Sequence, residues 1–446
     1  MAGKAKKDSR FNRGLRIGRL GAGLAGSYLG YQFQNLLLGG EQRDQRRKSF
    51  HNRAARKVRE ELQSLKGPVM KLGQILSMQS HLLPKEVISE LAHLQMRAPA
   101  MHPSLARAQF KASFGQFPED VFRTFEAEAF AAASLGQVHR AVSKDGTRLA
   151  VKIQYPAIRS AIENDFKLLR SAALPVRLTG HISESILREV EQGILEETDY
   201  IHEGKNIDFF RQQLRPLDYV HVPLVHWDLA TDRVLTMSFV PGEPLSDFLA
   251  NKKPSQQQRD LIGFRLLNLF SFQMHGIHAI HADPHPGNYL IQPDGAIGLV
   301  DFGCVKKFSA EFIELMKLFR QRAWLQGEEQ SQRMAQLIWG RDVLKRPRTA
   351  RKLLAGAIDV YHLLFPPSAS GRHIVDFGDP KLLQRMAQLW EESMRNKMAN
   401  PEFAFYSRAE LGLYNLLHLL RARIDTSKAF GAPRSFTPTT SSPPPE

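Results

Sequence analysis

The sequence predicts an α+β chain with two lobes, a β-rich lobe followed by a helical lobe. Residues 117–155 contain short apolar runs with strand character, and Lys144-Asp145-Gly146 marks a hairpin turn between two of them. Residues 256–281 contain a long apolar helix that should end at His275-Gly276, and helical patterns continue from about residue 305 to 425. A chain of 446 residues with 43% hydrophobic and 24% charged residues is long enough for such a unit with extensions.

A set of polar residues early in the helical lobe indicates the chemistry. Asn288 follows Asp283 by five residues, and Asp301 follows it by eighteen, within an Asp-Phe-Gly triplet. Protein kinases have this arrangement: a catalytic-loop Asp, an Asn that holds magnesium and a DFG Asp that holds magnesium against the nucleotide phosphates. The alternative is a polar turn before a buried strand, but four positions and two spacings agree, which favours a bilobed protein-kinase-like fold. A second triplet, Asp376-Phe377-Gly378, has no such partners.

The lysine and the phosphate loop of a kinase have counterparts earlier in the chain. Lys152 lies within an apolar strand, as does the kinase lysine that pairs with the α- and β-phosphates of ATP. An outward-facing, solvated lysine is the alternative for this position. The loop that should precede the strand is rich in alanine rather than glycine, which gives its backbone less freedom to approach phosphates. Its candidate binding residues are Ala131, Ala132, Ala133 and Ser134.

Two further stretches could complete a nucleotide site. The helical region before residue 213 holds several acids, of which Glu197 or Glu203 could pair with Lys152. A strand that runs into Pro241-Gly242 suits the hinge between lobes, whose backbone would contact adenine. Its candidate binding residues are Met237, Phe239 and Val240.

The net charge of +16 is concentrated at the start of the chain. Residues 1–60 hold 15 Lys or Arg and 4 Asp or Glu, so +11 of the excess lies there. A basic arm suggests an anionic partner, either membrane lipid or nucleic acid. No zinc-finger spacing or RNP-like motif supports nucleic acid. The single cysteine, Cys304, excludes an internal disulfide and fits a small core residue.

Residues 20–40 carry no charge and overlap a ladder of small residues at helical spacing. Such a ladder allows close helix–helix contact, which could make a homodimer. Polar residues interrupt the apolar run, so we expect a membrane-associating or weakly inserting segment, with a flexible basic leader as the alternative. The ladder consists of Gly14, Gly18, Ala22, Gly26 and Gly30.

These motifs together resemble the UbiB/AarF family of atypical protein-kinase-like proteins, over roughly residues 50–425. The family's KxGQ motif is similar to Lys71-Leu72-Gly73-Gln74, and its alanine-rich loop to residues 131–134. Its ExD element is similar to Glu197-Thr198-Asp199, with a further family glutamate at Glu203. Its catalytic loop and metal motif are similar to the stretches 281–288 and 301–303. Ser238 departs from the family, which often has an acidic hinge residue there.

The resemblance implies roles for individual residues. Asn288 and Asp301 would ligate Mg²⁺, and Asp283 would orient an attacking hydroxyl or water. His285 stands where ordinary kinases keep a basic residue near the γ-phosphate, a role that needs a protonated ring. Lys71 would reach toward the ExD acids and the phosphates, on a helix that covers the groove for a protein substrate.

The resemblance also implies a cellular role. We expect a Mg-ATP-dependent ATPase or small-molecule kinase that supports ubiquinone biosynthesis at a membrane, with anionic lipid and isoprenoid quinone precursors as partners. The expected location is the cytoplasmic face of a bacterial inner membrane, with the matrix side of the mitochondrial inner membrane as the alternative. A pseudokinase-like, ATP-gated lipid-binding module with negligible turnover is the rival function.

The sequence divides into five segments on this basis. They are a basic membrane-associating segment at 1–48, a helical KxGQ extension at 49–116, a kinase-like N-lobe with a helical insertion at 117–240, a helical C-lobe at 241–426 and a disordered tail at 427–446.

Overall fold

The computed structural model describes residues 101–133, 135–172, 191–192, 195–320, 325, 327–366, 368, 371–396 and 400–429. They fall into two units. The first holds the described residues up to Lys205 together with Leu224–Phe239, and the second holds Asn206–Pro223 together with the described residues from Val240 onward. The basic N-terminal segment, Lys71 and the chain from residue 430 lie outside the described residues.

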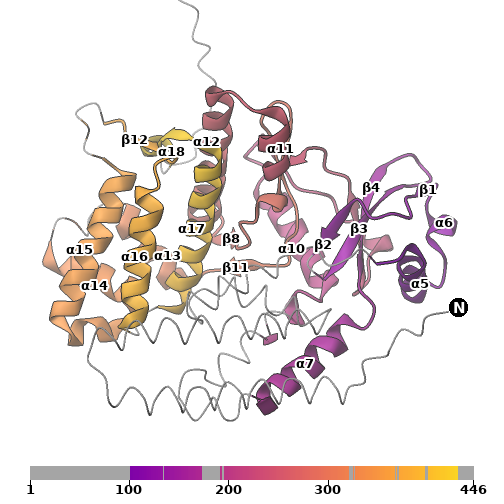
Figure 1. Cartoon of the computed structure of the whole chain (residues 1–446), viewed down its shortest axis with the longest axis horizontal. Helices are drawn as coiled ribbons and strands as arrows, with labels where there is room; N and C mark the ends of the chain where they lie inside the picture. Colours follow the sequence, from indigo (N-terminus) through magenta and orange to yellow (C-terminus); the bar gives the residue numbers. More distant parts are fainter. Residues whose placement is uncertain are drawn as a thin grey trace, which may run out of the picture. The chain divides into compact units, whose positions relative to one another are not determined.

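An antiparallel sheet is the centre of the first unit (Figure 1). The strand order is β1-β3-β4-β6, and β2 pairs with β3. Gly146, in the turn between β3 and β4, has φ +97°, a value that glycine adopts without steric cost, so the predicted hairpin is confirmed. The strands are β1 (Thr124–Phe125), β2 (Ala131–Ala133), β3 (Gly136–Val142), β4 (Arg148–Gln154) and β6 (Val234–Ser238).

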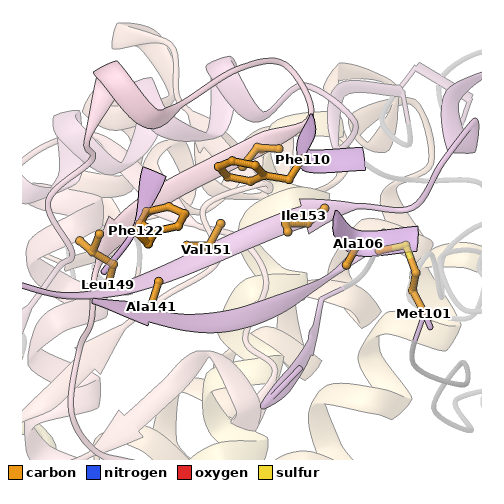
Figure 2. Packing of buried hydrophobic residues seen from close by; sticks show 9 residues of the cluster. Met101, Ala106, Phe110, Phe122, Ala141, Leu149, Val151 and Ile153 are labelled. Atoms are coloured by element: carbon orange, nitrogen blue, oxygen red, sulfur yellow. The ribbon is translucent and has the colours of Figure 1, made fainter. Parts of the chain in front are cut away.

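One face of this sheet carries the apolar core of the unit. Val151 and Ile153 of β4 alternate with Lys152, so they point to the opposite face from the lysine. Helix α5 (Pro103–Phe114) covers that face, and Figure 2 shows the ring of Phe110 beside these strand residues. Phe110, Val151 and Ile153 are fully buried, and each contributes about 1.5–3 kcal/mol.

Helix α5 differs from the segment division made from the sequence. The sequence predicts that residues up to 116 belong to an extension, yet α5 supplies Ala106 and Phe110 to the same cluster as Leu149 and Val151 of the sheet. The physical reason is that the alternating apolar side chains of β4 need a cover on this face. The other elements of the unit are α6 (Pro118–Val121), α7 (Ile158–Ala172), η1 (Trp227–Leu229) and the first part of α10 (Tyr200–Gln213).

Short strands in the second unit position the polar motifs. A four-stranded sheet has the order β5-β10-β9-β7, and a separate pair is formed by β8 and β11. Strand β8 leads into the stretch 281–288, and β10 leads directly to Asp301. The strands are β5 (Val220–His221), β7 (Glu243–Pro244), β8 (Ala279–His281), β9 (Tyr289–Ile291), β10 (Ile297–Leu299) and β11 (Val305–Lys307).

Helices make up most of the second unit, as the α+β prediction requires. Helix α12 begins after Ser255, whose side chain forms a capping box with Gln258, and it ends at His275 as predicted. It runs beside α17 in Figure 1. The helices are α11 (Leu245–Lys252), α12 (Gln256–His275), α13 (Ala310–Arg320), α14 (Glu328–Trp339), η4 (Arg341–Lys345), α15 (Pro347–Leu364), α16 (Lys381–Arg395), α17 (Pro401–Leu420) and α18 (Thr426–Ala429). Among the described residues, no helix has the length and apolar character to cross a bilayer.

The sequence predicts helices from about residue 305 to 425, but this part of the chain also contains short strands. Strand β12 (Ile374–Asp376) pairs with β13 (Arg423–Asp425), and β11 pairs with β8. Residues 427–429, predicted to open the disordered tail, belong to α18, because Ser427 donates from its backbone and side chain to Asp425 Oδ1 (3.2 and 2.6 Å). Three-residue strands carry too little periodic pattern to be recognised in a sequence.

Candidate active site

Lys152 forms a buried ion pair with Glu203. Nζ lies 2.7 and 2.8 Å from the two carboxylate oxygens of Glu203, and the two residues are 5% and 2% exposed. The ammonium group also lies 5.1 Å from the centre of the Tyr200 ring. The solvated alternative for Lys152 is therefore wrong. Of the two acids that the sequence offered, Glu203 is the one that contacts the lysine.

The Glu197–Asp199 turn lies at the start of the helix that carries Glu203. Asp199 Oδ1 accepts a hydrogen bond from the backbone N–H of His202 (3.0 Å), as a helix-capping aspartate does. The carbonyl of Thr198 accepts from Nε2 of Gln154 in β4 (2.9 Å). These two bonds tie the turn to the strand of Lys152 and fix the start of α10, on which Glu203 lies. Glu197 is half-buried within the turn.

The alanine-rich stretch is a strand. Ala131, Ala132 and Ala133 form β2 and pair with β3, and Ser134 lies outside the described residues. Gly136, which pairs with Ala133, has no room for a side chain unless its neighbours shift. A Cβ there would lie 2.3 Å from the carbonyl oxygen of Ile153 and 2.7 Å from the hydroxyl of Tyr200. The close approach of β3 to β4 and α10 therefore depends on this glycine, which sequence reasoning did not single out.

The predicted hinge residues lie where the chain leaves the first unit. Met237 pairs with Ala150 in β4, so it shares the sheet face of Lys152. The backbone N–H of Phe239 donates to the carbonyl of Arg148 (3.0 Å). Val240 is the first residue of the following part of the second unit. There, a Cβ on Gly298 would lie 2.6 Å from Val240 Cγ1.

Asp283 and Asn288 lie together in the second unit. Nδ2 of Asn288 donates to Oδ2 of Asp283 (2.9 Å) and to its backbone carbonyl (3.2 Å). Oδ1 of Asp283 is buried and has no hydrogen-bond partner among the described residues. The Asn288 amide nitrogen is a donor and points to Asp283, and the carbonyl oxygen Oδ1 is the atom of this side chain that can act as a ligand.

Asp301 is held next to this loop. The backbone N–H of Val300 donates to the carbonyl of Asn288 (3.1 Å). Asp301 has φ +63°, a left-handed conformation that aspartate tolerates better than most residues, and the N–H of Gly303 lies 3.4 Å from its Oδ1. His281 adds a second connection to the loop, with Nε2 2.7 Å from the carbonyl oxygen of Asp301.

His285 lies on the exposed side of the loop. The ring nitrogen Nδ1 accepts a hydrogen bond from the backbone N–H of Gly287 (3.1 Å). The backbone N–H of His285 donates to the carbonyl of Asp283 (2.8 Å). In a protonated imidazole both ring nitrogens are donors, so protonation would break the contact with Gly287. The cationic role predicted for His285 would therefore require this turn to rearrange.

The donor set fits a magnesium ion. Mg²⁺ prefers oxygen ligands and is usually bound by one or two carboxylates together with substrate phosphates and water. Asn288 Oδ1 and the Asp301 carboxylate are groups of this kind and would be the residues that hold the ion. The unpartnered, buried Oδ1 of Asp283 is an acceptor that a hydroxyl, a water or a hydrated ion can satisfy.

Two supporting residues carried no recognisable signal in the sequence. Oε1 of Gln273, in α12, accepts from the backbone N–H of His281 (2.9 Å). Nδ2 of Asn206 donates to the carbonyl of Phe302 (3.1 Å). Asn206 acts on a backbone group 96 residues away and Gln273 on one eight residues away, and neither belongs to a recognised sequence motif.

The comparison with protein families decides the classification. Residues 93–334, more than half of the chain, match the ABC1 atypical kinase-like domain. The chain belongs to this ABC1 atypical kinase-like family. The resemblance to the UbiB/AarF proteins and the kinase-like α+β fold are thereby confirmed.

Relatives in the family are named as kinases. The chain is 35% identical over 285 residues to Protein ACTIVITY OF BC1 COMPLEX KINASE 7, chloroplastic, of Arabidopsis thaliana, a match that covers 62% of this chain and 40% of that protein. It is 32% identical over 320 residues to AarF domain-containing protein kinase 1 of Mus musculus, covering 70% of this chain and 61% of that one. The chain thus spans about half the length of these curated relatives.

A solved structure has the same fold. It is a complex of Rv3197 from Mycobacterium tuberculosis with erythromycin, with a TM-score of 0.60 and 23% identity, and the match covers 86% of this chain and 97% of that one. At this identity the likeness concerns the fold alone. The family and its relatives make this chain an atypical kinase-like protein.

Proposed function

We propose that the chain binds Mg-ATP and acts as an atypical kinase-like ATPase rather than as an ordinary protein kinase. The observation that carries the proposal is that the two oxygens of the Asp283 carboxylate have different surroundings. One oxygen is held by Asn288, and the other is buried without a hydrogen-bond partner among the described residues. A buried acceptor of this kind is costly unless a ligand completes it.

Each residue of the site has a role in this proposal. Lys152, which is paired with Glu203, would neutralise the α- and β-phosphates, and Asn288 and Asp301 would hold the metal. Magnesium, when bound, offsets the negative charge of the phosphates. Asp283 orients the hydroxyl or water that receives the γ-phosphoryl group.

The test compares two aspartates in identical tripeptides. Asp301→Asn removes the charge but keeps the size and the tolerance for positive φ. Asp376→Asn makes the same change in the second Asp-Phe-Gly, where Oδ1 caps the Gly378 N–H (2.8 Å) and Oδ2 lies 3.2 Å from Nε of Arg423. We expect Mg-ATP to raise the melting temperature of the wild type and of Asp376→Asn, but not that of Asp301→Asn. Equal stabilisation of all three proteins would refute the magnesium assignment.

The membrane role extends the proposal. Family membership and the basic first 60 residues support a function in ubiquinone biosynthesis at a membrane. The partners would be anionic lipid and isoprenoid quinone precursors. The location would be the cytoplasmic face of a bacterial inner membrane or the matrix face of the mitochondrial inner membrane. A homodimer would form through the ladder of small residues. Deleting residues 1–40 should weaken co-sedimentation with anionic liposomes, and unchanged co-sedimentation would contradict the membrane role.

Phosphate release separates the proposal from its rival. We expect release to rise when anionic liposomes and a quinone-precursor mimic are added together, with Asp283→Asn as the inactive control. Mg-ATP binding without release under any of these conditions would favour an ATP-gated lipid-binding module with negligible turnover.

A further inference from the structure

Two residues one turn apart on helix α17 contact the two neighbours of Asp283. Nη2 of Arg408 donates to the carbonyl oxygen of Ala282 (3.3 Å). Gly412 lies against Pro284 so closely that a Cβ at Gly412 would be 2.0 Å from Cγ of Pro284. Positions i and i+4 share one face of a helix, so this face of α17 contacts the residues on both sides of the aspartate.

Arg408 also lies where the two polar motifs meet. Its Nη2 is 3.8 Å from Sγ of Cys304, the residue after the first Asp-Phe-Gly. The backbone N–H of Ala282 donates to the carbonyl of Cys304 (2.9 Å), and His281 pairs with Val305 between β8 and β11. The guanidinium group thus contacts both chain segments at the point where the backbone joins them.

The opposite side of α17 is anchored in the core. Oε1 of Glu410 accepts hydrogen bonds from the hydroxyls of Tyr406 and Tyr414, both at 2.9 Å, and all three residues are buried. At 100° per residue these positions lie on the side of the helix away from Arg408 and Gly412. The anchor resists rotation of α17, so the face toward Asp283 is fixed.

We infer that α17 is the template for the catalytic loop and that Arg408 and Gly412 are positioning residues for Asp283. This inference rests on the proposed function. Pro284 and Pro286 restrict the backbone of the loop, so its conformation is set by the points at which it is anchored. Arg408 fixes the Ala282 carbonyl, and the missing side chain at Gly412 sets how near Pro284 can approach. A displacement of about 1 Å at Asp283 is enough to reduce turnover about a hundredfold without removing any group that binds the nucleotide.

The test uses paired variants. Arg408→Met removes the donors and keeps the apolar stem, Arg408→Lys restores a donor, and Gly412→Ala adds one methyl group. The controls are Asn415→Ala, an exposed position on α17, and Gly356→Ala in α15, where the nearest neighbour of the added Cβ would be the flexible end of the Leu389 side chain at 2.9 Å.

We expect Arg408→Met and Gly412→Ala to lower kcat for phosphate release about a hundredfold while the Kd for Mg-ATP changes less than about threefold. Arg408→Lys should recover about tenfold of the loss, because it keeps a cationic donor. Both controls should behave as the wild type. Wild-type kcat in folded Arg408→Met and Gly412→Ala would overturn the inference.

A second measurement does not depend on turnover. Hydrogen exchange of the peptide 279–291 should be faster in Arg408→Met and Gly412→Ala than in the wild type and the controls. Unchanged exchange would overturn the template role even if the wild type released no phosphate. A wild type that binds no Mg-ATP would instead refute the proposed function, and the exchange data would still decide the role of α17. If Gly412→Ala does not fold, the two Arg408 variants decide it.

Discussion

Nε2 of His281 lies 2.7 Å from the carbonyl oxygen of Asp301, which joins the catalytic-loop motif to the metal motif. A carbonyl can only accept, so the imidazole must carry its proton on Nε2. Nδ1 is then the acceptor nitrogen, and it is buried without a hydrogen-bond partner among the described residues. His281 therefore acts as a fixed donor that holds the backbone of Asp301 in its left-handed conformation.

Replacing His281 with alanine should weaken magnesium binding. Loss of the donor leaves the Asp301 carbonyl unsatisfied, at a cost of about 1–3 kcal/mol, and frees the backbone that presents the carboxylate. Urea unfolding and a Mg²⁺ titration of ATP binding would measure the two effects. His362→Ala, at an exposed position of α15, is the control. An unchanged magnesium midpoint would show that the contact does not hold the metal ligand.

The Lys152–Glu203 pair should be more costly to break than to remove. Glu203→Gln leaves a buried ammonium group without its counter-charge and should destabilise the protein by about 3–5 kcal/mol in urea unfolding. The double variant Lys152→Met/Glu203→Leu should recover most of this stability but bind no ATP. Additive losses in the double variant would mean that the two side chains contribute independently.

Glu410 should make stability depend on pH. Burial raises the pKa of its carboxyl from 4.5 to about 7. As the pH rises, Glu410 therefore loses its proton in the unfolded chain before it does so in the folded protein. Its contribution to the free energy of unfolding is complete below pH 4.5 and is lost as the pH rises through 7. The loss amounts to about 3 kcal/mol.

Glu410→Gln keeps an oxygen that can accept from Tyr406 and Tyr414 and removes the titration. Its stability in urea should fall less between pH 5 and pH 8 than that of the wild type. Parallel pH curves for the two proteins would rule out a raised pKa at this position.

Gly136→Ala should lower both stability and ATP affinity. The added methyl group would press on the Ile153 backbone and the Tyr200 hydroxyl, at a cost of about 1–3 kcal/mol. Gly146→Ala is the matched control. The φ of +97° at this hairpin turn strains an alanine, so the variant should lose stability, but the position is open and the methyl group would press on no neighbour. Thermal unfolding should show losses in both variants, whereas calorimetry should show weaker Mg-ATP binding only in Gly136→Ala. Equal affinity in the two variants would argue against a role for Gly136 at the site.

The sequence was most informative where chemistry depends on local spacing. Asp283, Asn288 and Asp301 could be picked out because one short stretch of chain carries all three. The choice between Glu197 and Glu203 could not be made, since both lie in the same acidic region and only the capped start of α10 directs one of them to Lys152.

Long-range contacts account for most of what was missed. Arg408 acts on a backbone carbonyl 126 residues away, and Gly412 matters only because Pro284 approaches it. The residues that flank Arg408 and Gly412 in the sequence form no recognisable motif. The alanine-rich stretch predicts a loop from its own composition, because small side chains allow a backbone to approach phosphates. It forms a strand because β2 pairs with β3, which lies further along the chain.

Cys304, the only cysteine in the 446-residue chain, follows the first Asp-Phe-Gly directly and is half-buried. Any thiol-directed reagent therefore reacts at one known position, without the need to remove competing cysteines. A fluorophore or spin label attached there would sit beside Arg408 and the β8–β11 pair. The native chain thus carries its own attachment point for spectroscopy, one residue beyond the metal motif.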